Sequence, residues 1–297
     1  MSIKVSTITK KYNSQVAVND ISFKIEKGEI VGFLGPNGAG KSTMMKILTG
    51  YIGDFEGEAI VSDVNVRKDV LAAQKNLGYL PEHNPLYLEM YVREYLFFLA
   101  EVHKIEKGRV EEVIEQVRLT PEAGKKIKEL SKGYRQRVGI AAAILHNPEV
   151  LILDEPTTGL DPNQLVEIRE LIKSLGKDKT ILFSTHVMQE VEAICDRVIL
   201  INKGNLVADE NLKALKQNQD QIIEVEFDYR IEKNFIDAMP SLKAANNFHD
   251  TSWELVFTTK EDMRPKIFDF AQENGLKILN MTSKNKNLES LFRELTN

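Results

Sequence analysis

Residues 35–43 read GPNGAGKST, and no other stretch of the 297-residue chain limits the possible folds so strongly. The stretch matches the pattern G-x-x-x-x-G-K-[ST], in which glycines let consecutive backbone N–H groups turn toward one anion. The apolar run at 29–34 predicts a buried strand before it, and the apolar spacing over 43–49 predicts a helix after it. A glycine-rich turn that matched by chance would lack these flanks. The sequence therefore predicts a strand, loop and helix that bind a nucleoside triphosphate.

The residue types in this loop suit a phosphate chain. Lys41 adds a mobile positive charge that can neutralise the phosphoryl group during hydrolysis, so we expect it to be catalytic as well as binding. The hydroxyl of Ser42 is a suitable ligand for Mg²⁺, and the helix that follows directs its positive end at the phosphates. We expect ATP to be held by Gly35, Pro36, Asn37, Gly38, Ala39, Gly40, Lys41, Ser42 and Thr43.

Two acids follow an apolar strand at 150–153, where a parallel sheet presents its functional groups. An apolar strand before an acidic turn is common in any protein, but here it lies downstream of a phosphate loop. We therefore expect Asp154 to hold Mg²⁺ and Glu155 to orient or deprotonate the attacking water. His186 comes just after another strand, at 180–183, and could reach the terminal phosphate or the water.

The segment LSKGYRQR, residues 130–137, places a serine and a glycine at the start of a helix. In isolation the segment is typical of an ordinary capped helix, with Ser131 as the cap. A helix start of this kind can also bind phosphate through its backbone, which makes Ser131 and Gly133 candidate contacts for the nucleotide.

Composition bounds the class of protein. The chain has 42% hydrophobic and 28% charged residues, as soluble globular proteins do, and a net charge of −5 gives no reason to expect nucleic acid as a partner. The single cysteine, Cys195, excludes an internal disulfide and a multi-cysteine metal site. The first residues lack the apolar segment of a signal peptide, and apolar runs fall short of the about 20 residues that a membrane span needs. We expect any membrane connection to come through a partner.

Strands and helices alternate up to about residue 215, which predicts a mainly parallel sheet covered by helices. Short strands are expected at 3–9, 16–18, 21–25, 57–64, 76–80 and 198–202, and helices over 86–118, from 132 onward, and at 163–175 and 187–195. The helical stretch at 86–118 carries the aromatic residues Tyr87, Tyr91, Tyr95, Phe97 and Phe98. This stripe is typical of helical core, although part of it could form a groove for a partner.

A polar stretch at 211–220 separates this region from a second domain over 220–297. Strands are expected there at 221–229, 242–248, 252–259 and 276–282, and helices at 231–239 and 262–274. This order is that of a small α+β domain of the ferredoxin-like kind, and a last short helix is expected at 287–295.

The motifs GPNGAGKST, LSKGYRQR, LILDEP, GLD at 159–161 and STH at 184–186, in this order, resemble the ATP-binding subunits of ABC transporters. The resemblance covers residues 1–215 and is greatest to gliding-motility-associated ATP-binding subunits. It implies a P-loop ATPase fold with a helical subdomain, and an exporter that binds ATP and Mg²⁺. It also implies two such subunits closing around two ATP molecules, separate membrane permease subunits, and a cytoplasmic location on the inner face of the cell membrane.

The resemblance assigns further roles to individual positions. Tyr12 is implied to stack on adenine, and His186 to contact the γ-phosphate. Ser131 and Gly133 are implied to contact ATP that the other subunit holds, and Asp161 to communicate across that interface.

Two positions depart from the usual family pattern. Glu82 stands where the family usually has glutamine, so a carboxylate that can still approach Mg²⁺ adds negative charge beside Asp154 and Glu155. The segment SKGY stands where SGGQ is commonest, so Lys132 and Tyr134 alter the expected contact with the opposing ribose.

Two other classes of protein compete with this interpretation. A soluble ABC ATPase acting on DNA or ribosomes would typically show long coiled coils, zinc ligands or two tandem cores, and the sequence shows one core without them. A P-loop kinase or GTPase would leave LSKGYRQR unexplained, and the chain has no guanine-binding N-K-x-D segment.

Overall fold

The computed structural model describes residues 1–212, 214, 221–259 and 261–283. The chain divides into two compact units, Met1–Leu212 and Lys213–Asn297. The predicted helix at 287–295 lies outside the described residues.

The first unit is built on a six-stranded sheet in the order β10-β9-β3-β8-β7-β6. Strands β9, β3, β8, β7 and β6 run parallel, and β10 pairs antiparallel at the edge. The bounds are β3 Ile30–Leu34, β6 Leu77–Leu80, β7 Val150–Asp154, β8 Thr180–Thr185, β9 Arg197–Asn202 and β10 Asn205–Asn211. The three central strands are buried along their whole length, as expected of a sheet that is covered on both faces. The predicted α/β class with a parallel sheet is confirmed.

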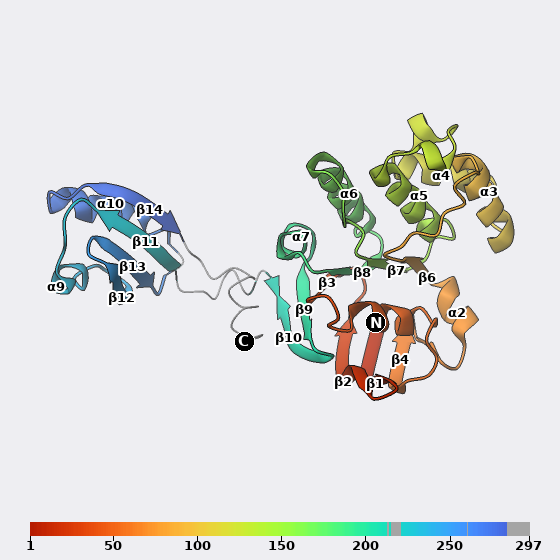
Figure 1. The fold of residues 1–297 in the computed structure, drawn as a ribbon, viewed down its shortest axis with the longest axis horizontal. Coiled ribbons are helices and arrows are strands. Elements are labelled where there is room, and N and C mark those ends of the chain that lie inside the picture. Colours follow the sequence, from red (N-terminus) through yellow and green to blue (C-terminus); the bar gives the residue numbers. More distant parts are fainter. Residues whose placement is uncertain (213, 215–220, 260, 284–297) are drawn as a thin grey trace. The chain divides into compact units, whose positions relative to one another are not determined.

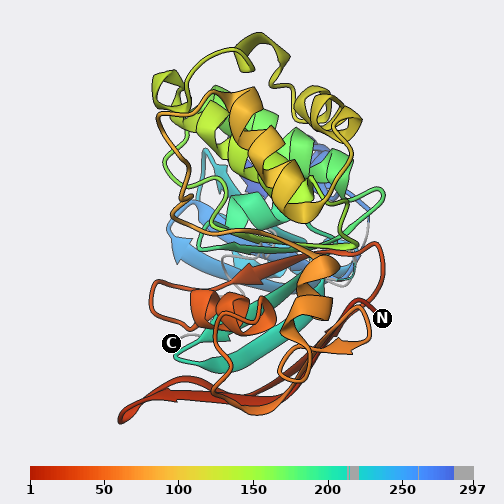
Figure 2. The ribbon, with the colours of Figure 1, turned by 90° about the vertical axis from the view of Figure 1, so that its right-hand side faces the viewer.

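Alternate residues of the central strands face two different cores. Leu151 and Leu153 pack with the helices on one face, whereas Val150 and Ile152 belong to the core on the other face. The helical face carries α3 Val92–His103, α4 Gly108–Gln116, α5 Lys132–Ile144, α6 Pro162–Leu175 and α7 Met188–Ile194, with short 3₁₀ turns at Thr120–Glu122 and Ile127–Glu129. Figure 1 and Figure 2 show α3, α4, α5 and α6 together on this side of the sheet.

The opposite face is covered by a second, antiparallel sheet with α1 and α2. Its strand order is β2-β1-β4-β5, with β1 Ile3–Tyr12, β2 Gln15–Ile25, β4 Glu56–Val61 and β5 Val64–Asn65. Helix α1, Lys41–Leu48, contributes four buried apolar residues to the core between the two sheets, and α2 spans Val70–Lys75. The phosphate loop therefore leaves the central sheet at β3 and leads straight into this core.

Several predicted boundaries are wrong. The strands expected at 16–18 and 21–25 are one strand, β2, which passes through a left-handed residue at Asp20. The strand expected at 57–64 is two, because the left-handed Ser62 and Asp63 turn the chain between β4 and β5. The helix expected over 86–118 starts at Val92 and breaks at Lys104, which is also left-handed and ends α3. The sequence prediction also missed α2 and β10.

The second unit has the predicted order of strand, helix, strand, strand, helix and strand. The elements are β11 Gln221–Phe227, α9 Lys233–Ile236, β12 Leu242–His249, β13 Ser252–Phe257, α10 Arg264–Glu273 and β14 Ile278–Ser283. The sheet order is β12-β13-β11-β14 with every neighbour antiparallel. Alternate residues of β11 and β13 are buried in a core of their own. The helix expected at 231–239 is much shorter, since α9 has four residues.

Because each unit has its own core, a protein truncated after residue 216 should fold and bind nucleotide. Far-ultraviolet circular dichroism and binding of a fluorescent ATP analogue, compared with the full chain, measure both properties. An insoluble or non-binding truncated protein would show that the second unit is needed for the first to fold.

Candidate active site

The loop at 35–40 approaches its neighbours too closely for side chains at two positions. A Cβ atom at Gly35 would lie 2.4 Å from the carbonyl oxygen of Ile201 on β9. Gly40 has φ +106°, and a Cβ atom there would lie 2.4 Å from the carbonyl oxygen of Ala17 on β2. The loop is thus pressed between β9 and β2, and glycine is required for its backbone to reach that position.

Lys41 is the first residue of α1, and its side chain is buried, with 6% exposed. Its ammonium donates to the carbonyl oxygens of Gly35 at 2.8 Å and Pro36 at 3.3 Å. The same nitrogen lies 3.3 Å from Glu155 Oε1. The positive charge is therefore fixed between the loop and the carboxyl end of β7, two segments that are about 115 positions apart in the chain.

A cavity of about 670 Å³ lies over this lysine. It brings together ten of the residues expected to form the site: Tyr12, Asn37, Gly38, Gly40, Lys41, Ser42, Thr43, Glu82, Glu155 and His186. Gly35, Pro36 and Ala39 belong to the loop but do not line the cavity, and Ala39 is buried in the core. A volume of this size suits a small-molecule ligand.

Asp154 is not among the residues that line the cavity, and only 1% of its surface is exposed. Burial raises the pKa of its carboxyl group, hydrogen bonds from Ser184 and Ser42 lower it, and the nearby charges of Glu82 and Glu155 raise it. The pKa of the Tyr79 hydroxyl is raised by burial and then by Asp154 and Glu82. Asp154 and Glu155 thus place negative charge where water scarcely reaches, and the exposed Glu82 adds to it from the cavity wall.

These oxygens fit a magnesium ion. No three His, Cys, Asp or Glu side chains form a metal cluster in the part of the chain that the structure describes. Mg²⁺ needs only one or two protein oxygens when phosphates supply others, and Ser42 with Asp154 offers a hydroxyl and a carboxylate in contact. Glu82, at the cavity wall, could add a third oxygen or act through its charge alone.

Glu155 is held on several sides, and its backbone is left-handed, with φ +50°. Its N–H donates to the hydroxyl and carbonyl oxygens of Ser184, and its Oε2 accepts from Thr158 Oγ1 at 3.0 Å. The same Oε2 lies 2.9 Å from His186 Nδ1. Fixed by Lys41, Thr158 and His186, the carboxylate projects into the cavity, where it could orient a water molecule.

Ser131 and Gly133 do not line this cavity. Ser131 caps α5, its Oγ accepting from the N–H of Tyr134 and from Gln164 Nε2, each at 3.3 Å. Both residues line a separate small hollow with the start of α6, where the Asp161 side chain caps the helix by accepting from the N–H of Gln164 at 2.9 Å. The ammonium of Lys132 lies against Gly159. The LSKGYRQR segment and the GLD segment therefore form one surface.

Sequence reasoning missed several residues of the site. Gln15 and Ala17 line the cavity from β2, and no sequence pattern marks them. Thr158 and Ser184 both bond Glu155. Thr158 lies between two recognised motifs and Ser184 is the first residue of the STH segment, but nothing in the sequence marks either hydroxyl as a partner of Glu155.

Comparisons with known proteins all point to one family. The model of the ABC transporter family matches residues 18–158. The chain is 33% identical over 300 residues to the bacitracin transport ATP-binding protein BcrA of Bacillus licheniformis, covering 99% of this chain and 96% of that protein. It is 34% identical over 303 residues to the Nod factor export ATP-binding protein I of Rhizobium meliloti (strain 1021), covering 100% of this chain and 88% of that protein.

The fold is similar to that of solved cassettes. One is the dimeric structure of a post-hydrolysis state of an ATP-binding cassette bound to ADP and phosphate. It matches with a TM-score of 0.64 and 27% identity, covering 71% of this chain and 98% of that one. Among the residues that the structure describes, no helix combines the length and apolar character needed to cross a membrane.

Replacing Lys41 with alanine should lower the rate of ATP hydrolysis by at least about a hundredfold, because the fixed charge facing the phosphates is lost. Lys46→Ala is a matched control, because it removes the same charge from an exposed position on the same helix. Steady-state phosphate release measures both. Equal loss in the two variants, or near-normal hydrolysis by Lys41→Ala, would contradict the assignment.

Replacing Glu82 with glutamine should leave the hydrolysis rate within about threefold of wild type, a change of about 0.7 kcal/mol. The amide keeps an oxygen at the cavity wall and removes one charge beside Asp154, so the Mg²⁺ requirement should not weaken. Rates across a Mg²⁺ titration measure this. Abolished hydrolysis would assign Glu82 an essential catalytic role.

Proposed function

This chain belongs to the family of ABC transporter ATP-binding proteins, and from that premise we propose that it is the ATP-hydrolysing subunit of an exporter. It dimerises around two ATP molecules and drives separate membrane subunits. The observation that carries the proposal is the set of contacts on Glu155, which lies 3.3 Å from the phosphate-loop lysine and 2.9 Å from His186.

Hydrolysis requires positive charge at the phosphates and a base at the attacking water. In our account the loop N–H groups and Lys41 bind the phosphates, and Glu155 takes the proton from water. His186 bonds to the base and lines the cavity, so it can contact the γ-phosphate or hold the water in line. Mg²⁺, held by Ser42 and Asp154, would neutralise charge on the phosphate oxygens.

Tyr12 provides the proposed contact with the base of the nucleotide. It lies at the end of β1, lines the cavity and is 46% exposed. The ammonium of Lys10 lies 4.9 Å from its ring centre and fixes the aromatic face on one side. The other side is available to stack on a planar base.

We propose that each catalytic site is completed by a second subunit. Within one chain, Ser131 and Gly133 lie in a hollow separate from the nucleotide cavity. Ser131 is exposed and stands at the N-terminus of a thirteen-residue helix, a position that favours an anion. In a head-to-tail pair, this helix end would face the phosphates that the partner binds, so ATP itself would hold the two chains together.

A membrane subunit is proposed to bind the aromatic surface of the helical part. The stripe at 86–102 is divided: Tyr95 is buried, whereas Tyr87, Tyr91 and Phe98 are about half exposed. Tyr87 packs edge-on against both Tyr95 and Phe98, with centroids 5.9 and 6.0 Å away. Exposed aromatic residues anchored in this way suit an interface with another protein.

The transport direction and location are also proposals. The relatives named for Nod factor export and bacitracin transport support an exporter. The gliding-motility resemblance rests on the sequence around residues 78–96 and on the appended second unit. We place the protein in the cytoplasm at the inner face of the cell membrane, attached through its permease partner and without a nucleic-acid partner.

Replacing Glu155 with glutamine should yield a stable dimer in the presence of Mg-ATP, because the base is lost while the phosphate site remains. Adding Ser131→Arg should abolish that dimer, since a long side chain would fill the space meant for the partner's phosphates. Sizing chromatography with Mg-ATP measures both changes.

The matched control adds Ser241→Arg, a change at an exposed serine in the second unit, to Glu155→Gln. This protein should dimerise like the single variant. A dimer equally stable with Ser131→Arg would refute the shared site.

A further inference from the structure

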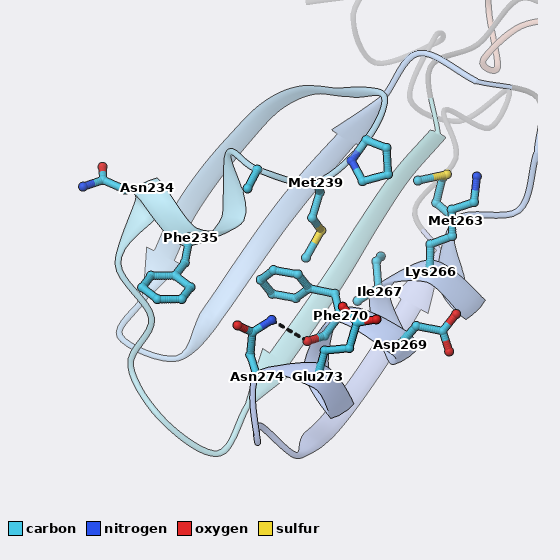
Figure 3. Close-up of a pocket in the computed structure, with 12 residues that line it drawn as sticks. Asn234, Phe235, Met239, Met263, Lys266, Ile267, Asp269, Phe270, Glu273 and Asn274 are labelled. Carbon is cyan, nitrogen blue, oxygen red and sulfur yellow. Dashed lines mark hydrogen bonds between the residues drawn. The ribbon is translucent and has the colours of Figure 1, made fainter.

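A second cavity, of about 690 Å³, lies in the C-terminal unit between α9 and α10. Figure 3 shows the side chains of Met239 and Phe270 facing each other across it, with Phe235 projecting from α9. Every described residue that lines it comes from positions 234–274, within this unit. None of these residues lines the nucleotide cavity.

The cavity exists because α9 is short. A sheet face of the ferredoxin-like kind is normally covered by two helices, but α9 has four residues where α10 has ten. Helix α10 covers its share of the sheet with the buried Ile267 and Ala271. Beside α9 the sheet is incompletely covered, and 57% of the surface of Phe235 is exposed. An exposed phenylalanine at the edge of an apolar hollow is a typical feature of a binding site.

The floor of the cavity is apolar and adaptable. It includes Met239, Met263 and Ile267, which are 6%, 1% and 0% exposed and belong to the core of this unit. Methionine side chains are flexible and polarisable, so they repack around ligands of different shapes. Such a floor can bind the apolar part of a ligand without requiring one particular ligand shape.

The rim of the cavity is acidic. Asp269 and Glu273 both line it from α10, four residues apart and hence on the same face of the helix. Both are exposed, and within the described part of the chain neither carboxylate has an ion-pair partner. Lys266, the one basic residue among the described residues of the lining, is paired with Glu261 at 2.7 Å. The rim therefore carries two uncompensated negative charges.

We propose that this cavity binds an organic cation with an apolar body, the body lying against Met239, Ile267 and Phe270 and the charge facing Asp269 and Glu273. The volume is in the range that takes a drug-sized molecule. Charge complementarity at the rim selects cations over anions of equal size. The C-terminal unit would thus be a ligand-binding module joined to the ATPase.

Two probes of nearly equal shape and opposite charge test the proposal. Tetraphenylphosphonium and tetraphenylborate present the same four phenyl rings, so a purely apolar site would not prefer the cation. The full chain is titrated with each by calorimetry, and by fluorescence of Trp253, the single tryptophan, which lies in the core of this unit. We expect the phosphonium to bind one to one and the borate at least about fivefold more weakly.

Substitutions locate the binding. Asp269→Asn with Glu273→Gln should weaken phosphonium binding roughly three- to tenfold, as expected for two exposed charges. The control pair, Glu232→Gln with Asp237→Asn, removes the same charge from exposed residues of the α9 segment that do not line the cavity, and it should bind like wild type. Phe235→Ala should weaken the binding of both probes. Because Phe235 is exposed, its removal should leave the fold intact, which circular dichroism checks.

Three results would overturn the proposal. The first is equal affinity for the two probes, and the second is phosphonium binding that the Asp269 and Glu273 changes leave unaltered. The third is a wild-type chain that dimerises without nucleotide and a Phe235→Ala variant that does not. A second copy of the chain would then occupy the cavity. ATP hydrolysis is assayed separately on each variant, so failure of this proposal leaves the ATPase assignment standing.

Discussion

The buried ammonium of Lys41 is the interaction on which the rest of the site depends. A buried charge is costly unless it is paired and hydrogen-bonded, and this one contacts the carbonyls of Gly35 and Pro36 and the carboxylate of Glu155. Those contacts are possible only because β3 and β7 both pair with β8, which brings their carboxyl ends to the same edge. The loop must in turn press against Ile201 of β9, which only glycine allows at position 35. The buried charge of Lys41 therefore depends both on the order of the strands and on the glycine at position 35.

The parts of the fold that the sequence predicts best are those whose physical cause is local. The phosphate loop and the apolar strands β3, β7 and β8 carry their signal within a few residues, and the structure places them as expected. Strand β10 was missed because it is an exposed edge strand whose residues, such as Asp209 and Glu210, do not alternate with apolar ones. The contacts of Thr158 and Ser184 with Glu155 depend on tertiary geometry that no spacing in the sequence encodes.

Two charged residues distinguish this chain from the usual pattern, and they differ in their surroundings. Glu82 lies at the nucleotide cavity, where it adds to the negative field that raises the pKa of Asp154. Lys132 lies on the surface formed by the LSKGYRQR and GLD segments, with its ammonium against Gly159. In the proposed dimer that surface faces the partner's nucleotide, so the added acid of one chain and the added base of the other would lie near the same bound nucleotide. Their charges are opposite in sign, which limits the net change in the field at the shared site.

The central claim is that two chains build each catalytic site, and mixing two inactive variants tests it most directly. Chains with Lys41→Ala keep an intact Ser131, and chains with Ser131→Arg keep an intact phosphate loop. In a mixed dimer these intact halves meet at one of the two sites, so an equimolar mixture should hydrolyse ATP faster than either variant alone. Random pairing of the two chains corresponds to about a quarter of the wild-type rate. A mixture whose rate equals the mean of the two variants measured alone would contradict the account.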